Sequence, residues 1–156
     1  MPTNNLKSKV PTRGGPDLED IVASAESALQ GMEQEYEVWV AEDVEKISKL
    51  LEKARESSPA PEALIDEIQG ISHDIKGQAG TFNFPLLTET GKSLCKLIQK
   101  DMVAACQRLD LIEAHVDAMR IIISQRIKGS GGAVGKSLTS ALNQAVEKVL
   151  SEGGKK

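Results

Sequence analysis

Apolar side chains recur at intervals of three and four residues along most of this 156-residue chain, and this spacing is typical of amphipathic helices. The predicted helical segments lie at about 17–30, 32–56, 61–82, 85–100, 102–127 and 136–150. No segment shows the alternation that a β-strand requires. We therefore expect an all-α fold, an antiparallel four-helix bundle with an extra N-terminal helix and a C-terminal amphipathic helix. Gly31 is the expected break between the first two segments.

Glycine, proline and small polar residues divide the chain into parts. We expect a flexible N-terminal tail, the bundle, a Gly-rich linker, the C-terminal helix and a short tail, at residues 1–16, 17–128, 129–135, 136–150 and 151–156 respectively. The linker predicts that the last helix is separable from the bundle. A chain that ends at Lys128 is therefore expected to remain folded.

One face of the segment 61–82 carries a histidine among polar residues and glycines. At about 100° per residue, His73 points away from Ile71 and the rest of the apolar stripe, so it is expected to face solvent. The residues that project within roughly 60° of it are Asp66, Gln69, Gly70, Lys76, Gly77 and Gly80. Each glycine in a helix interior costs about 1 kcal/mol relative to alanine. The cluster therefore indicates a functional, bare surface around the imidazole, with close packing against a neighbouring helix as the alternative.

His73 is the candidate nucleophile on this face. A neutral imidazole can attack phosphorus, and Lys76 follows at a spacing that lets it neutralise phosphoryl oxygens. Ser72 is not expected to act with His73, because adjacent helical residues project about 100° apart. His115 lies toward the edge of the apolar stripe of another helix and is interpreted as a boundary residue. Neither histidine belongs to a Glu-x-x-His pair, so no metal site is expected.

The composition argues against several other classes of protein. A net charge of −4 and only one Trp, one Tyr and two Phe provide neither a basic surface nor stacking platforms for nucleic acid. No apolar run approaches the ~20 residues of a membrane span, and the N-terminus lacks a hydrophobic signal region. Cys95 and Cys106 fall at apolar helical positions and are expected to pack in the core. These features predict a cytoplasmic protein.

The run from Gly129 to Ser137 has a partial likeness to a phosphate-binding loop. That loop requires a glycine where this chain has Ser130, and it follows a β-strand. Here a predicted helix precedes the run. We interpret it as a linker followed by a helix start.

The segment from His73 to Asn83 resembles the signature of histidine phosphotransfer (HPt) domains, H-x-[LI]-K-G-x-[AS]-x-x-[FL]-[GN]. The matching positions are His73, Ile75, Lys76, Gly77, Ala79, Phe82 and Asn83. With its flanking helices, the resemblance covers roughly residues 18–128. Gln78 departs from the pattern, since the family often has serine or another small residue there.

This resemblance implies a four-helix bundle that carries a phosphoryl group between the aspartates of response-regulator receiver domains. His73 would be the phosphoacceptor, and Lys76 would stabilise the phosphoryl group. The surface expected to contact a partner comprises Asp66, Gln69, Gly70, Gly77, Gln78 and Gly80. Receiver domains are the implied partners, with a hybrid histidine kinase as a further candidate. The receiver supplies Mg²⁺ in such a reaction, so we expect this chain to have no cofactor of its own. We also expect a monomer without a nucleotide site.

Two alternatives remain at this point. The residues Ser72 to Lys76 also resemble the H-box of sensor kinases, but Gly77 and Gln78 replace the Thr or Asn and the Pro of that motif. A dimeric, kinase-like phosphotransferase bundle without an ATP-binding domain is therefore one alternative. The other is a helical scaffold that docks a partner through the same face and is never phosphorylated.

Overall fold

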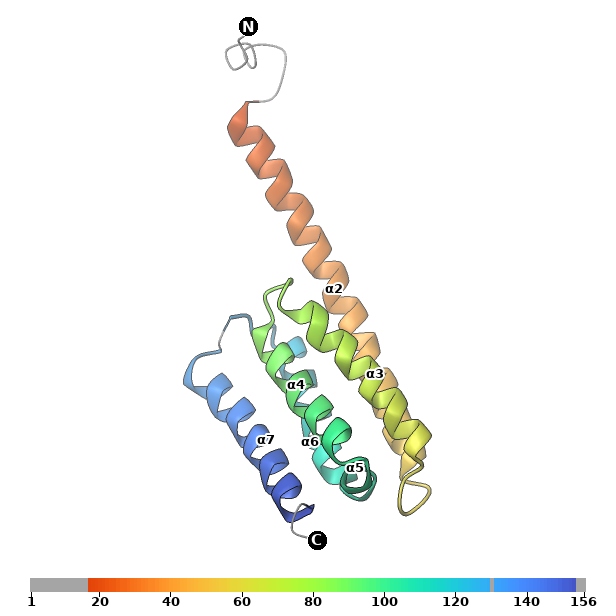
Figure 1. The fold of residues 1–156 in the computed structure, drawn as a ribbon. Helices are drawn as coiled ribbons and strands as arrows, with labels where there is room; N and C mark the ends of the chain where they lie inside the picture. Colours follow the sequence, from red (N-terminus) through yellow and green to blue (C-terminus); the bar gives the residue numbers. More distant parts are fainter. Residues whose placement is uncertain (1–16, 130, 154–156) are drawn as a thin grey trace, which may run out of the picture. The chain divides into compact units, whose positions relative to one another are not determined.

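Six α-helices follow one another in the part of the chain that the computed structural model describes, residues 17–129 and 131–153 (Figure 1). They are α2 (Leu18–Ala54), α3 (Glu62–Ala79), α4 (Pro85–Lys100), α5 (Met102–Gln107), α6 (Leu109–Ser124) and α7 (Gly132–Gly153). These residues contain no strand, which confirms the all-α prediction. The tail expected at 1–16 lies outside the described residues.

The break expected at Gly31 is wrong, because α2 runs through this residue without interruption. The segment expected to be a separate N-terminal helix is the first part of α2. One interior glycine costs about 1 kcal/mol, which the remaining turns of a long helix readily offset. The carboxylate of Asp17 accepts a hydrogen bond of 2.9 Å from the amide of Asp20 and so caps the helix start. The chain divides into two compact units after Tyr36, and the bundle described next belongs to the second unit.

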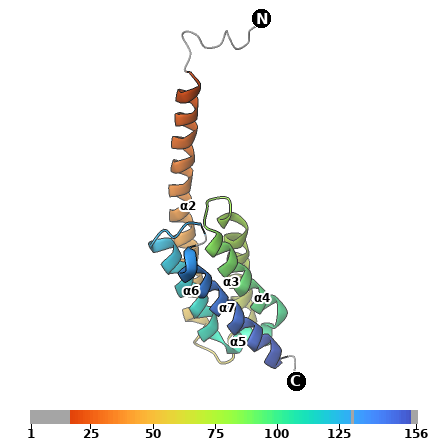
Figure 2. The ribbon, with the colours of Figure 1, turned by 90° about the vertical axis from the view of Figure 1, so that its left-hand side faces the viewer.

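Within the second unit, α3 and α6 run antiparallel to α4, whereas α7 runs parallel to it, since Gly131 lies beside Leu86 and Gly153 beside Asp101 (Figure 1). The last part of α2 is joined to α6 by the ion pair of Glu45 with Arg120 (3.1 Å), and Arg55, just after α2, pairs with Glu113 on α6. α4 lies between α3 and α7 and also packs against α6 (Figures 1 and 2). The core is mostly aliphatic, with Phe84 as a buried aromatic residue, and includes Val40, Val44, Ile47, Leu51, Ile65, Ile68, Ile75, Leu87, Leu94, Leu97, Ile112, Val116, Met119 and Ile122. Cys95 and Cys106 are also buried, as predicted from their apolar positions.

The long helix expected at 102–127 is also wrong, since it is divided into α5 and α6 at Arg108. In an unbroken helix the carbonyl of Cys106 would accept from the amide four residues later. Instead it accepts a hydrogen bond of 3.1 Å from the amide of Ala60. Arg108 then binds both carboxylate oxygens of Asp110, each at 3.0 Å, beside the new helix start. The break therefore comes from a tertiary contact that the apolar period does not reveal.

The Gly-rich linker expected at 129–135 is shorter than predicted, because α7 already begins at Gly132 and continues to Gly153. Gly129, Gly131 and Gly132 have φ angles of 66°, 68° and 65°, a conformation that side chains rarely adopt. These glycines turn the chain from α6 into α7. α7 buries Leu142, Val146 and Val149 and packs against α4 and α6. α7 therefore covers part of the bundle, while the folding of a chain that ends at Lys128 stays a prediction.

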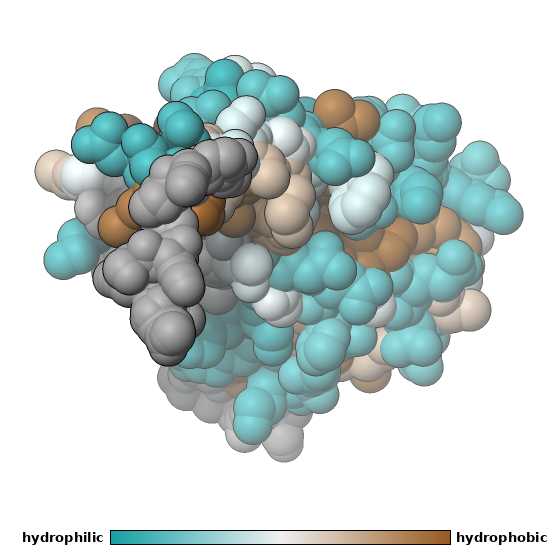
Figure 3. Space-filling model, turned by 90° about the horizontal axis from the view of Figure 1, so that it is seen from above, coloured by the Kyte–Doolittle hydropathy of each residue, from teal (hydrophilic) through white to brown (hydrophobic). Residues whose placement is uncertain are grey.

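No helix in the described ranges is long and apolar enough to cross a membrane. Seen from above, the molecule presents mostly hydrophilic side chains, and hydrophobic side chains appear there only in scattered patches (Figure 3).

Candidate functional site

The structure places His73 on the exposed side of α3, opposite the buried residues of the same helix. Ile68 and Ile75 face the core, and Ser72 is fully buried. The hydroxyl of Ser72 donates a hydrogen bond of 2.8 Å to the carbonyl of Ile68. That hydroxyl is therefore held within the helix and does not point to solvent beside the imidazole, as the helical geometry predicted.

The other predicted site residues lie on the surface of α3 and at its C-terminal end. Asp66, Gly70, Gly77, Gln78 and Gly80 are exposed, while Gln69 and Lys76 are half-buried. A Cβ atom added at Gly70 or Gly77 would meet no atom within 4 Å. These two glycines consequently have no packing role among the described residues, and the surface beside the imidazole is bare.

Gly91 on α4 is a residue that the sequence analysis missed. A Cβ atom added there would lie 3.1 Å from the Cβ atom of Lys76 and 3.2 Å from the carbonyl oxygen of Ser72. Both contacts are tighter than almost all contacts of real Cβ atoms. Gly91 therefore lets α4 approach the backbone on either side of His73. A glycine within the apolar pattern of α4 was the available signal, because it carries the same helix cost as the glycines of α3.

Lys76 lies against α4 beside Gly91. Its charge acts to lower the pKa of the buried Cys95 thiol on α4, although burial has the larger effect and raises that pKa. Lys76 forms no ion pair with any described residue, so its ammonium group remains available for an anionic ligand. Its role beside His73 stays a prediction.

The turn after α3 is fixed by backbone hydrogen bonds. The amides of Phe82 and Phe84 both donate to the carbonyl of Ala79, at 3.2 Å and 2.9 Å. Asn83 adopts a φ of 65°, and asparagine tolerates this left-handed conformation better than most residues. The turn allows α4 to start at Pro85, which suits a first helical turn. Asn83 and Phe82 therefore serve the geometry of the α3–α4 pair.

His115 is buried, with a relative exposure of 0%, so its interpretation as a boundary residue is wrong. Its Nδ1–H donates a hydrogen bond of 2.8 Å to the carbonyl of Leu111. Its Nε2 then accepts from the hydroxyl of Ser93 on α4, 2.9 Å away. This arrangement suits the neutral imidazole. Burial lowers the pKa of His115, and the hydrogen bond to Leu111 opposes that shift to a smaller extent.

Acid should therefore weaken the fold through His115. The unfolded chain binds a proton near pH 6.5, but the folded chain resists protonation at this site. The contribution is complete above pH 6.5, and the free energy of unfolding should fall by up to about 1.4 kcal/mol for each pH unit below it, until the folded protein also binds the proton. Urea unfolding between pH 7.5 and about 5 measures this slope. His115→Gln should flatten it and His73→Gln should not; equal slopes in all three proteins would assign the effect elsewhere.

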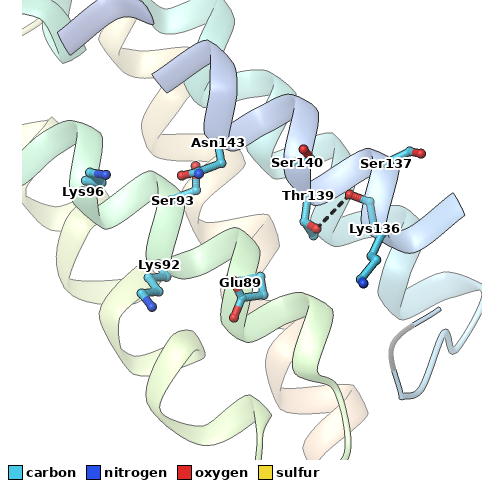
Figure 4. A pocket seen from close by; sticks show the side chains of 9 residues that line it. All are labelled: Glu89, Lys92, Ser93, Lys96, Lys136, Ser137, Thr139, Ser140 and Asn143. Carbon is cyan, nitrogen blue, oxygen red and sulfur yellow. Dashed lines mark hydrogen bonds between the residues drawn. The ribbon is translucent and has the colours of Figure 1, made fainter. Parts of the chain in front are cut away.

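A polar cavity of about 710 Å³ lies between α4 and α7, and Figure 4 shows its lining. Lys92 and Lys96 reach it from α4, and Lys136 and Ser137 reach it from α7. Lys136 and Ser137 belong to the run that partly resembles a phosphate-binding loop. Here both lie inside a helix, and the helix α6 precedes them instead of a strand. The run therefore contains a helix start, as interpreted from the sequence, and does not have the geometry of a nucleotide-binding loop.

Comparison with protein families gives one match that covers most of the chain. The model described as Hpt domain matches residues 16–121, which include α2, α3, α4 and α5 and most of α6. Comparison with curated proteins and comparison with solved structures found no match. The family match favours the phosphotransfer signature over the H-box alternative.

Proposed function

Because the chain belongs to the Hpt domain family and acts in histidine phosphotransfer within a phosphorelay, we propose that His73 is the residue that carries the phosphoryl group. Such a domain is a carrier without a kinase domain of its own. One observation carries the proposal. The chain has two histidines, and the second one, His115, is buried and hydrogen-bonded at both ring nitrogens. His73 alone is exposed to a partner.

The proposed step exchanges one phosphorus bond for another. A ring nitrogen of His73 attacks the phosphorus of a phospho-aspartate on a receiver domain, a P–N bond forms, and the aspartate carboxylate leaves with the electrons of the P–O bond. The reverse step passes the phosphoryl group to the aspartate of a second receiver. The partner contributes its acidic pocket and Mg²⁺, while this chain contributes position and charge.

Hpt domains pair with receiver domains, and we propose the surface of α3 as the docking site on this chain. Gly70, Gly77 and Gly80 would admit the rim of the receiver pocket, and Asp66, Gln69 and Gln78 would form polar contacts around it. The exposure of this surface and the open space at Gly70 and Gly77 support the assignment. A hybrid histidine kinase that carries a receiver is a further candidate partner. We propose that the chain acts as a cytoplasmic monomer.

The experiment is a transfer assay with a panel of phosphorylated receiver domains. The full chain should gain a phosphoryl group that is labile in acid and stable in alkali, and should lose it to a second, unphosphorylated receiver. A chain that docks receivers but never gains the label would instead be the unphosphorylated scaffold.

Lys76→Ala should preserve the fold and slow transfer by about tenfold or more, because a hydrogen bond to a charged group is worth about 1.5–3 kcal/mol. Circular dichroism checks the fold. Rapid-quench kinetics measures the rate of transfer, and the lifetime of phospho-His73 measures the stability of the bound phosphoryl group. Lys148→Ala is the matched control, since it removes an exposed lysine from α7. If both variants transfer at the rate of the parent chain, Lys76 is only a surface charge.

A further inference from the structure

The first part of α2 presents a row of large apolar side chains to solvent. Leu18 is 74% exposed, Leu29 is 56% exposed, and Ile21, Val22 and Met32 are each about half exposed. Their spacing of 3, 1, 7 and 3 residues places them within about 60° of one direction on the helix. We call these five residues the α2 stripe. An apolar row of this kind is the feature that anchors an amphipathic helix to another protein.

Acidic residues border the α2 stripe on both sides. Between Asp17 and Tyr36 the chain has six acidic residues, Asp17, Glu19, Asp20, Glu26, Glu33 and Glu35, and no Lys or Arg. At 100° per residue, Glu19 and Glu26 lie about 90–110° to one side of the stripe, and Glu35 lies about 90° to the other. A partner on the stripe therefore meets negative charge along both of its edges.

This charge pattern identifies the partner's chemistry. If a second copy of the chain packed its own stripe here, carboxylates would face carboxylates in either a parallel or an antiparallel pair, which opposes association. A partner with Lys or Arg on both sides of an apolar row gains attraction at the same positions. We propose that the α2 stripe binds a basic amphipathic helix of another protein, on a surface separate from α3.

Two synthetic helical peptides of about 18 residues test this proposal with the full chain. Both carry the same Leu and Ile row, one flanked by lysines and the other by glutamates. In fluorescence anisotropy at about 50 mM salt, the lysine peptide should bind at least tenfold more tightly than the glutamate peptide. Its affinity should fall several-fold at about 300 mM salt, because salt screens exposed charges.

Variants assign the binding to the stripe. Leu29→Gln should weaken binding of the lysine peptide about tenfold, because it removes an exposed apolar side chain that the peptide would cover. Val134→Gln is the control, since Val134 is a 78% exposed residue on α7, and it should change nothing. Glu26→Gln combined with Glu35→Gln should flatten the salt dependence. All variants should still accept a phosphoryl group on His73, which shows that they fold.

Four results would overturn the proposal. Equal affinity for both peptides, or for the parent chain and Leu29→Gln, would show that the stripe does not select a basic partner. Absence of binding to the lysine peptide would do the same. A dimer of the parent chain in sedimentation equilibrium that Leu29→Gln dissociates would identify a second copy as the occupant instead.

Discussion

His73→Gln should abolish the acid-labile, alkali-stable phosphoryl label and leave the helical fold unchanged. Glutamine keeps a polar side chain at an exposed position but lacks the ring nitrogen that forms the P–N bond. Substitutions at exposed sites away from special features usually change stability by less than about 0.5 kcal/mol. The expected loss of transfer is therefore complete, while the far-ultraviolet circular dichroism and the thermal midpoint stay close to those of the parent chain.

The same experiment can locate the label independently. The parent chain, phosphorylated by a receiver and digested at alkaline pH, should give one labelled peptide that contains His73. Label on a peptide that contains His115 would contradict the assignment, since that histidine is buried between α4 and α6. Labelling of His73→Gln to the same level as the parent chain would also contradict the assignment.

Gly77→Gln should reduce receiver-to-His73 transfer about a hundredfold without destabilising the isolated protein. The position has open space around it, so the longer side chain fits on the free surface. A docked receiver would meet that side chain, and a displacement of the reacting atoms by ~1 Å costs roughly a hundredfold in rate. Transfer kinetics and the thermal midpoint must be measured on the same preparation.

Two alanine variants provide the matched comparison. Gly77→Ala should raise the free energy of unfolding by up to about 1 kcal/mol, because alanine is the better helix former. Gly91→Ala gains the same propensity but forces a Cβ atom against the backbone of α3, and overpacking typically costs about 1–3 kcal/mol. It should therefore lower the midpoint. If Gly77→Ala and Gly77→Gln lower the midpoint as Gly91→Ala does, Gly77 packs against protein and the docking face lies elsewhere.

The exposed face of α3 could be predicted from the sequence because helix period and burial are directly related. Once Ile68 and Ile75 occupy the core, the rotation per residue fixes the outward direction of His73 and Gly77. The outward direction of these two residues can be assigned without knowledge of the other helices. The family signature then added the chemistry expected at that face.

Features that depend on contacts between helices could not be predicted in this way. The apolar period passes through Arg108 unchanged, and the hydrogen bond from Ala60 to Cys106 at the break between α5 and α6 is a contact with a distant part of the chain. His115 seemed peripheral because the pattern of one helix does not show that Ser93 on α4 lies against its ring. The role of Gly91 likewise depends on the distance between two helices, which no local pattern contains.

The position of α4 between α3 and α7 also affects how the carrier associates with its partners. Because α4 is packed on both sides, it is already ordered before a partner docks on the neighbouring surface of α3. Docking therefore costs little conformational entropy in this part of the chain. The ion pair of Lys96 with Glu147 helps to hold that arrangement from the side opposite α3. We therefore expect association close to a rigid-body encounter, in which partners exchange rapidly without a slow rearrangement of the carrier.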